Sequence, residues 1–289
     1  TGFIGSALCN KLLEDGHIPT LVSRNPLAAE KQFTGRIRVI KKAAELAAGD
    51  TFDVVINLAG APVVGLPWTK NRRAVLLASR VNVTADLLQF VRTCIHKPAV
   101  WIQASAIGYY GAHAAEAVTE TSPRGTGFAA ELCSAWEAMT DELEALQIRR
   151  VVLRFGLVFG RSGGALPLMM LPFRFCVGAV VGSGKQKVAW VHLTDVVRVI
   201  NLAMTSPKAS GIYNVVAPEC PSYATFASAL GQVLKRPVFL RIPAFILRTM
   251  LGEMASMLVD GPGILPARLL DSGFEFSFPA LRPALQELS

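Results

Sequence analysis

Short apolar runs alternate with longer segments of helical spacing along the first half of the chain. The runs that predict strands lie at 18–22, 37–40, 52–60, 100–105 and 150–160. Apolar positions three and four residues apart predict helices at 6–13, 70–93 and 130–146. Nearly continuous apolar strands are typical of parallel sheets that are covered on both faces. The alternation therefore predicts an α/β fold with a Rossmann-type, doubly wound parallel sheet.

The second half of the chain is less regular. Residues 161–190 are apolar and rich in glycine, which suits loops that form the wall of a small-molecule pocket. Helical spacing returns at 223–234 and at 244–258. We therefore divide the chain into a Rossmann domain over 1–220, which includes the loops around 161–190, and a small C-terminal α/β domain over 221–289 on the substrate side.

The first residues resemble the second half of a glycine-rich turn between a strand and a helix. Thr1, Gly2, Phe3, Ile4 and Gly5 precede the first predicted helix. Glycines let backbone N–H groups approach a pyrophosphate, and a helix N-terminus favours its negative charge. The turn thus indicates a nucleotide cofactor, and we expect the strand that precedes such turns to be absent from this sequence. The alternative is an ordinary tight turn before a helix.

The residues after the second predicted strand discriminate between the two nicotinamide cofactors. An NAD site usually has an Asp or Glu there, which accepts hydrogen bonds from the adenosine ribose. This chain has Ser23 and Arg24 instead. A guanidinium can bind a 2′-phosphate through two hydrogen bonds, and a hydroxyl can donate another. We therefore predict NADP rather than NAD; the alternative is a solvated arginine at the mouth of a loop.

Composition limits the other classes of function. The 289 residues carry a net charge of +8 and are 52% hydrophobic. The cations are scattered, without interleaved aromatic side chains, so we predict no nucleic-acid partner. The longest apolar region, 164–182, is interrupted by prolines and an arginine, so we predict no membrane partner. The five cysteines and four histidines lack the spacing of a zinc site, so we predict no metal.

Several predicted strands end in residues that suit a ligand site. Leu58, Ala59 and Gly60 end the third strand, Ser105 ends the fourth, and 155–158 lies in the exit loop of the fifth. Ligands of open α/β sheets bind beyond the carboxyl ends of the strands. We expect these segments to converge on one crevice with the glycine-rich turn.

Longer motifs carry a resemblance to a known family. They lie at 2–5, 22–24, 55–62, 79–80, 105–111 and 190–196 and, in the tail, at 265–268 and 273–276. Over its full length the chain resembles the epimerase family proteins, atypical members of the extended short-chain dehydrogenase/reductase superfamily with a C-terminal domain of unknown function. The resemblance implies NADP as the cofactor, held by the turn at 2–5 and by Ser23, Arg24, Leu58, Ala59, Arg80 and Val158.

The position of the usual catalytic pair of that superfamily is altered. Active members use a Tyr and, four residues later, a Lys whose charge supports proton transfer by the phenol. Phe128 and Leu132 occupy these positions, and they can neither donate a proton nor lower a pKa. Ser105, Tyr109 and Tyr110 follow a predicted strand near the expected nicotinamide and are the candidates for catalytic roles. Because the sequence indicates no cation beside them, the alternative is that the tyrosines pack against the cofactor or the core.

These observations leave two interpretations of function. The leading one is an NADP-dependent oxidoreductase or nucleotide-sugar-epimerase-like protein that acts by hydride exchange on a small hydroxyl- or carbonyl-bearing substrate. The alternative is a catalytically impaired NADP(H)-binding redox sensor or scaffold, which the altered Tyr–Lys pair favours. We further expect a homodimer and a cytoplasmic location, with organellar targeting left open because N-terminal residues are expected to be missing.

Overall fold

The computed structural model describes residues 2–111 and 117–289. Its centre is a four-stranded parallel sheet with the strand order β10-β5-β4-β3. The strands are β3 (Val54–Asn57), β4 (Val100–Ala106), β5 (Arg149–Phe155) and β10 (Gly211–Val215). In register, Val54 pairs with Val100, which pairs with Arg149. The parallel sheet expected from the apolar runs is confirmed.

A smaller parallel pair precedes this sheet along the chain. β1 (Thr20–Val22) and β2 (Arg38–Ile40) pair from Thr20 with Arg38 onward. The helix between them, α2 (Pro26–Gln32), starts with a proline, and the side chain of Asn25 accepts a hydrogen bond from a first-turn N–H. Both features favour a helix start, because the N–H groups of the first turn have no partner within the helix. Proline has no N–H, and the side-chain oxygen of Asn25 accepts a hydrogen bond from one of the remaining N–H groups.

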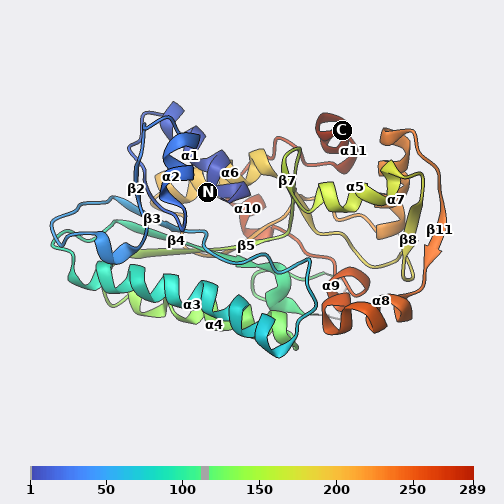
Figure 1. Ribbon diagram of the computed structural model, residues 1–289, viewed down its shortest axis with the longest axis horizontal. Coiled ribbons are helices and arrows are strands. Elements are labelled where there is room, and N and C mark those ends of the chain that lie inside the picture. The colour runs from blue at the N-terminus through green and yellow to red at the C-terminus, as the bar shows by residue number, and fades with distance from the viewer. Residues whose placement is uncertain (1, 112–116) are drawn as a thin grey trace.

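Helices cover both faces of the central sheet (Figure 1). α1 (Phe3–Glu14) and α6 (Leu193–Thr205) lie on one face, and α3 (Lys70–Thr93) and α4 (Phe128–Ala138) lie on the other. Alternate residues of β4 serve the two sides: Ile102 packs with α1 and α6, and Trp101 packs with α3. Since side chains alternate between the faces of a strand and helices cover both faces, the first residues of β4, Val100–Ile102, are all apolar and buried. This doubly wound arrangement confirms the predicted fold class.

The strand predicted in the first part of 150–160 is confirmed, but the exit loop expected at 155–158 contains the start of a second strand. β5 ends at Phe155, and β6 (Leu157–Gly160) belongs to another sheet with β7 (Gly163–Gly164) and β9 (Trp190–His192). Gly156 lies at the junction, where a Cβ would be 2.7 Å from the carbonyl oxygen of Ala189. The chain therefore leaves the central sheet at a residue that has no side chain.

The helix predicted at 130–146 is shorter in the structure. α4 ends at Ala138, and a 3-10 turn follows at Asp141–Leu143. The hydroxyl of Thr140 donates to the carbonyl of Glu137 at 2.7 Å and accepts from the Nε of Arg150 at 2.8 Å. These bonds satisfy the helix end and join it to β5, a side-chain effect that apolar spacing does not contain.

The region at 161–190 packs on the C-terminal part of the chain. It contains α5 (Leu166–Arg174) and β8 (Gly178–Val181), and β8 pairs in parallel with β11 (Val238–Ile242). α7 (Tyr223–Leu234) and α11 (Leu281–Leu288) share one apolar core with this region, which includes Phe159, Phe173, Trp190, Phe226, Leu230, Leu281 and Leu285. The loop-like character expected at 161–190 therefore holds only in part, and the division at residue 220 stays a prediction.

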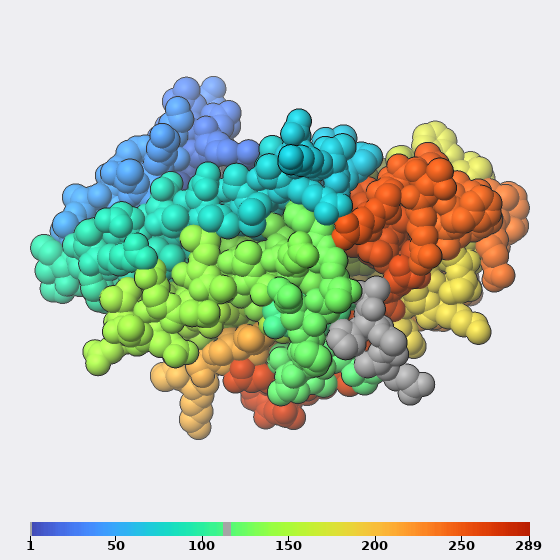
Figure 2. All heavy atoms as spheres, turned by 90° about the horizontal axis from the view of Figure 1, so that it is seen from below, coloured from blue at the N-terminus to red at the C-terminus, as the bar shows by residue number. Residues whose placement is uncertain are grey.

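The second C-terminal helix, predicted at 244–258, is interrupted. α8 (Ala244–Leu251) ends at Gly252, which has a φ of 58°. The 3-10 turn η4 (Gly252–Ala255) and the short helices α9 (Ser256–Val259) and α10 (Ala267–Asp271) follow. A positive φ suits glycine and ends a helix. Seen from below, the orange segment 239–258 adjoins the cyan residues at the start of α3 (Figure 2), where Arg73 and Glu253 form an ion pair of 2.7 Å.

α3 differs from the other described helices in its length. Within 2–111 and 117–289 it is the one helix long and apolar enough to cross a membrane by length and composition. Its buried side chains include Leu76, Leu88 and Val91, which pack in the cores beneath the sheet. α3 therefore packs against the sheet with one side, while Val75 and Leu77 remain exposed.

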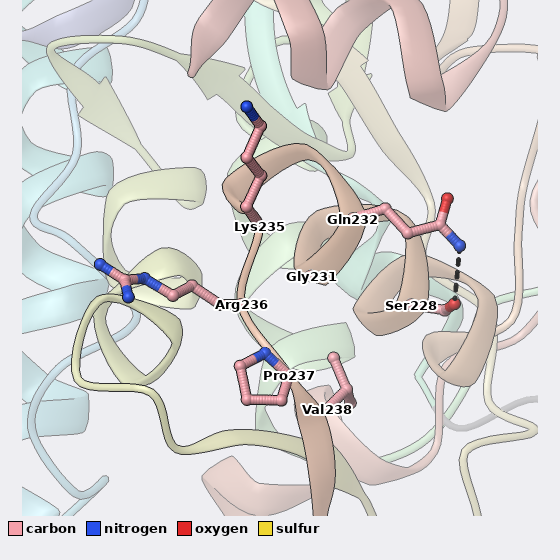
Figure 3. A pocket seen from close by; sticks show the side chains of 7 residues that line it. All are labelled: Ser228, Gly231, Gln232, Lys235, Arg236, Pro237 and Val238. Carbon is pink, nitrogen blue, oxygen red and sulfur yellow. Dashed lines mark hydrogen bonds between the residues drawn. The ribbon is translucent and has the colours of Figure 1, made fainter.

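Two surface clefts lie over α7. One, of about 420 Å³, is lined by Ser228, Gly231, Gln232, Lys235, Arg236, Pro237 and Val238. In Figure 3 the side chains of Lys235 and Arg236 diverge, so the two cations do not converge on one point. The other cleft, of about 570 Å³, shares Ser228 and Gln232. Among the described residues, the predicted site residues line neither cleft, so we place the candidate site elsewhere.

Candidate functional site

The glycine-rich turn lies at the N-terminus of α1. Gly2 precedes the helix with an extended backbone (φ −85°, ψ 176°), and the first turn carries no acidic side chain. A Cβ on Gly2 or Gly5 would meet no described atom within 4 Å, so the space over this helix end is open. Open space above free first-turn N–H groups fits a pyrophosphate. Ile4 packs partly in the main core, and Thr1 lies outside the described residues.

Phe3 connects this helix end to the β6–β7 turn. Its ring lies where side chains of three glycines would be: a Cβ on Gly160, Gly163 or Gly164 would come within 2.5, 2.6 or 2.8 Å of ring atoms. Glycines at these positions are required because the ring occupies the space. Val158 of β6 is 8% exposed, and its backbone oxygen accepts a hydrogen bond from Ala165 at 3.0 Å. The packing of Phe3 on this turn thus keeps the N-terminus of α1, where we expect the pyrophosphate, next to β6, the strand that contains Val158.

Ser23 and Arg24 follow β1 directly and have different environments. Ser23 is 5% exposed, and its hydroxyl bonds with the backbone of Asn25 at 3.3 Å. Arg24 is exposed and has no hydrogen bond or ion pair within the described parts of the chain. Its guanidinium is therefore available to an anion in solution or to a bound ligand.

A buried polar network fixes the end of β3. The side-chain amide of Asn57 donates to the hydroxyl of Thr84 at 2.8 Å and to the Oε1 of Gln103 at 3.1 Å. The Oδ1 of Asn57 accepts the backbone N–H of Ala59 at 3.2 Å. Buried polar groups that satisfy one another hold a single arrangement. The network therefore sets the path of Leu58, Ala59 and Gly60, which leave the sheet at this point.

Arg80 is a buried cation beside that loop. It is 8% exposed, and it donates to the carbonyl oxygens of Leu76 at 3.0 Å and Ala61 at 3.2 Å. A Cβ on Gly60 would lie 2.9 Å from the guanidinium carbon, so a side chain there would displace the guanidinium of Arg80. Burial lowers the pKa of Arg80, and no described carboxylate pairs with it. A desolvated cation of this kind favours a nearby anion.

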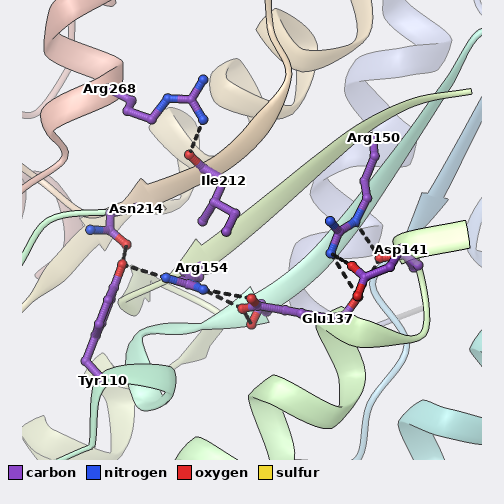
Figure 4. Close-up of polar contacts among 10 residues, drawn as sticks. Tyr110, Glu137, Asp141, Arg150, Arg154, Ile212, Asn214 and Arg268 are labelled. Atoms are coloured by element: carbon purple, nitrogen blue, oxygen red, sulfur yellow. Dashed lines mark hydrogen bonds and ion pairs between the residues drawn. The ribbon is translucent and has the colours of Figure 1, made fainter. Parts of the chain in front are cut away.

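Ser105 belongs to a buried ionic network between β4, α4 and β5. The hydroxyl of Ser105 donates to the Oε1 of Glu137 at 2.5 Å. Arg154 donates to both oxygens of Glu137, at 2.9 and 2.8 Å (Figure 4). Arg154 is 1% exposed; burial lowers its pKa, but the bonds to Glu137 outweigh burial and raise the pKa above its ordinary value. Arg154 is therefore charged, and the hydroxyl of Ser105 is committed to Glu137.

The two candidate tyrosines both lie against Arg154, and their rings meet edge to face with 5.4 Å between the ring centres. The hydroxyl of Tyr110 accepts from Arg154 at 2.9 Å and donates to the Oδ1 of Asn214 at 2.6 Å. Tyr110 is fully buried, and burial raises its pKa despite the nearby Arg154. Tyr109 is half-buried, and its ring centre lies 3.4 Å from the guanidinium carbon of Arg154. Of the three predicted hydroxyls, that of Tyr109 has no hydrogen bond to a described residue.

The positions of the usual Tyr–Lys pair lie in an apolar cluster. Phe128 and Leu132 pack with Trp68, Leu76 and Met254. The rings of Trp68 and Phe128 meet edge to face, with 5.2 Å between their centres. This cluster offers no proton donor, so any proton transfer depends on other residues.

Thiol chemistry is disfavoured near this network. Cys133 is 5% exposed and lies beside Ser105; burial and the charge of Glu137 raise its pKa to about 11. The thiol is therefore neutral at ordinary pH and a poor nucleophile. Across 2–111 and 117–289, no group of three or more His, Cys, Asp or Glu side chains is placed to hold a metal ion.

Arg154 and Asn214 were not predicted from the sequence as members of the site, whereas Glu137 was expected in the interior or the site wall. A signal was present, because Arg154 interrupts the apolar run Val151–Val152–Leu153 and Phe155 of a strand expected to be buried. A charge on such a strand requires a buried partner. The sequence does not reveal which residues are the partners of Arg154, because Glu137 and Tyr110 come from separate segments that only the fold brings together.

Comparisons with known proteins agree with this geometry. The model of the NAD dependent epimerase/dehydratase family matches residues 1–216, and that of a domain of unknown function (DUF1731) matches 242–288. The epimerase family protein YfhF of Bacillus subtilis is 35% identical over all of this chain and 95% of its own length. A chloroplastic SDR39U1 homolog of Arabidopsis thaliana is 33% identical over all of this chain and 84% of its own length.

One similar protein has been solved with a nicotinamide cofactor. The crystal structure of human epimerase family protein SDR39U1 (isoform 2) with NADPH is 33% identical in sequence and has a TM-score of 0.88. The similarity covers 99% of this chain and 96% of the human chain. Relatives thus occur in a bacterium and a chloroplast, whereas the location of this protein stays a prediction. The match of the family model and of these relatives over the whole fold shows that this chain belongs to the NAD-dependent epimerase/dehydratase family.

Proposed function

We propose that this protein binds NADP(H) and exchanges hydride between the cofactor and a small hydroxyl- or carbonyl-bearing substrate. The observation that carries the cofactor assignment is Arg24, an exposed cation directly after β1 with no partner among the described residues. A guanidinium at this position binds the 2′-phosphate that distinguishes NADP from NAD. The human relative with NADPH supports the same choice.

Other residues would hold the rest of the cofactor. The open helix end at Gly2 and Gly5 fits the pyrophosphate, and the loop from Leu58 to Gly60 would pack on the adenosine or the ribose. Arg80, a buried cation beside that loop, would stabilise the negative charge of the phosphates. When bound, the nicotinamide supplies or accepts a hydride.

Tyr109 is the residue that we propose as the proton donor. In a reduction, a hydride from the cofactor would reach the carbonyl carbon, and the phenol of Tyr109 would protonate the carbonyl oxygen to give the alcohol. The support is that Ser105 and Tyr110 are committed to internal partners, whereas the hydroxyl of Tyr109 has none among the described residues. Arg154 beside its ring provides the positive charge that Leu132 cannot.

Calorimetry with NADPH and NADH tests the cofactor assignment. We expect tighter binding of NADPH and, for Arg24→Ala, a loss of roughly 10- to 100-fold for NADPH with little change for NADH, because charge-assisted hydrogen bonds contribute about 1.5–3 kcal/mol. Arg36→Ala, which removes another exposed arginine, is the matched control. Equal affinities for both cofactors in the wild type would contradict the assignment.

The second candidate function is an NADP(H)-binding sensor or scaffold without turnover. It is favoured by one observation, the burial of Phe128 and Leu132 in an apolar cluster at the positions of the usual pair. Oxidation of NADPH in the presence of a panel of aldehydes and ketones separates the two functions. Turnover that Tyr109→Phe abolishes supports the oxidoreductase, and tight NADPH binding without turnover supports the sensor.

A further inference from the structure

Arg72, in the first turn of α3, is a half-buried cation without a counter-ion. Its Nη2 donates to the carbonyl oxygen of Pro62, and this is the one hydrogen bond that its guanidinium makes within 2–111 and 117–289. Its Nε is buried and has no partner there. A guanidinium has five N–H donors, and a buried donor without a partner is costly. The remaining donors of Arg72 therefore favour an acceptor that the described residues do not supply.

Positive charge prevails around Arg72. Arg80 donates to the carbonyl oxygen of Ala61, the neighbour of the carbonyl that Arg72 contacts. Burial lowers the pKa of Arg80 most, and the charge of Arg72 lowers it further, so the two cations act on each other. Glu253, which reaches this end of α3, is already bonded to the neighbouring arginine and to the N–H of Phe128. Two adjacent cations without a carboxylate partner attract an anion.

The order of contacts along the loop after β3 shows where Arg72 lies. Arg80, which we assign to the cofactor phosphates, donates to Ala61 at 3.2 Å. Arg72 contacts the next carbonyl, and the Nε1 of Trp68 donates to the one after that at 3.0 Å. The ring of Trp68 meets that of Phe128, which occupies the position of the usual catalytic tyrosine. Arg72 thus contacts the loop between the cofactor side and the position of that tyrosine.

The proposed proton donor lies near the same helix start. The guanidinium carbon of Arg73, the residue after Arg72 in α3, lies 5.0 Å from the centre of the Phe128 ring. Gly108 precedes Tyr109, and a Cβ on Gly108 would lie 3.3 Å from the Cβ of the residue that follows Phe128. The segment of Tyr109 and the first turn of α3 therefore both pack on the start of α4. A substrate that reaches Tyr109 would lie beside this helix start.

We propose that Arg72 binds an anionic group of the substrate, a carboxylate or a phosphate, beside the bound cofactor. The inference rests on the proposed function, because it names the substrate class: a small anion that also carries a hydroxyl or a carbonyl. A guanidinium binds either group through two parallel hydrogen bonds, and the bond to Pro62 already holds that of Arg72 in place. The cofactor phosphates are assigned to Arg24, to the start of α1 and to Arg80, which leaves Arg72 for the substrate.

Calorimetric titration of inorganic phosphate and of acetate into the protein saturated with NADP⁺ tests the proposal. The cofactor occupies its own phosphate sites in this complex, so the two probes report a separate anion site. We expect at least one probe to bind, and Arg72→Gln to raise its dissociation constant at least about 10-fold. Arg72→Lys keeps the charge without the planar fork and should lose less. Lys70→Gln, which removes an exposed cation from the same helical turn, is the matched control and should bind like the wild type.

Three results would overturn the proposal. If neither probe binds to the wild type, the anion site does not exist. If Arg72→Gln binds the probe as tightly as the wild type, the anion lies elsewhere. If the probe binds only without NADP⁺ and Arg72→Gln weakens NADPH binding, Arg72 belongs to the cofactor site. Failure of the wild type to bind NADP⁺ would instead contradict the proposed function, and the same titration of the cofactor-free wild type and Arg72→Gln would still test the anion site.

Discussion

The guanidinium carbon of Arg154 lies 3.4 Å from the centre of the Tyr109 ring. Arg154 is held there by two bonds to Glu137, with both side chains almost fully buried. In short-chain dehydrogenases of the usual type a lysine four residues after the tyrosine supplies the charge, whereas the cation against the Tyr109 ring is an arginine of β5 that is also paired with Glu137. The contact gives Tyr109 the cation that the sequence around it lacks.

Tyr109 and Tyr110 are adjacent, so replacing each by Phe separates catalysis from stability. We expect Tyr109→Phe to lower kcat/KM for NADPH-dependent turnover by about 100- to 10,000-fold, the usual contribution of a positioned acid, with the melting temperature retained. Tyr110→Phe should instead lower stability by about 1–3 kcal/mol, because Arg154 and Asn214 each lose a buried partner. Equal losses of activity in the two variants, measured with the same substrate, would remove the distinction.

Arg154→Met should destabilise the protein by about 3–5 kcal/mol, because Glu137 would remain buried without its counter-ion. Adding Glu137→Leu removes the buried carboxylate that has lost its counter-ion, so the double variant should be more stable than Arg154→Met. Urea unfolding of both variants and of the wild type measures the difference. A double variant that is less stable than the single one would mean that the bond Glu137 accepts from Ser105 contributes more than the unpaired buried charge costs.

Much of the fold follows from local patterns, but the site depends on contacts between distant segments. Residues 70–93 were predicted as a helix and form α3 with the same bounds, since its spacing and its cap, Thr69, are both local. The end of the strand near Gly156 was predicted, but the second strand at 157–160 was not predictable, because its partner Trp190–His192 comes from a distant part of the sequence. The glycine-rich turn could be predicted because its glycines are neighbours in the sequence. The contact between Arg154 and Tyr109 could not, because folding brings together two segments that are far apart in the sequence.

Gly160→Ala should disturb the cofactor site through Phe3. The new Cβ would lie 2.5 Å from the Cζ of the ring, so the ring and the helix end behind it must move. Overpacking of this kind costs about 1–3 kcal/mol. We expect lower stability and weaker NADPH binding, and we expect Phe3→Leu to recover part of both in the double variant. A double-mutant cycle by urea unfolding checks the coupling, and strictly additive effects would exclude the contact as the cause.

Cys133 should resist alkylation near neutral pH. Its pKa is raised to about 11, chiefly by burial, so only about one molecule in a thousand carries the thiolate at pH 8. The exposed Cys176 should react with iodoacetamide far faster, as peptide mass spectrometry would show. Because the folded pKa is raised above the unfolded one, protonation of Cys133 stabilises the fold below about pH 9 and this stabilisation is lost toward pH 11. Labelling of Cys133 as fast as Cys176 at pH 8 would contradict this, and protein unfolded in urea is the control.

Glu253 connects the C-terminal part of the chain to the start of α4. Gly127 provides no side-chain cap, and the Oε1 of Glu253 accepts the N–H of Phe128 at 2.6 Å while its Oε2 pairs with Arg73 at 2.7 Å. We expect Glu253→Ala to cost about 1 kcal/mol, the usual value of a helix cap, because the ion pair is exposed and adds little. Glu253→Gln keeps the accepting oxygen and should retain most of the stability in thermal unfolding. If Gln proves as damaging as Ala, the charge on Arg73 rather than the cap holds the two parts together, and Arg73→Met should then reproduce the loss.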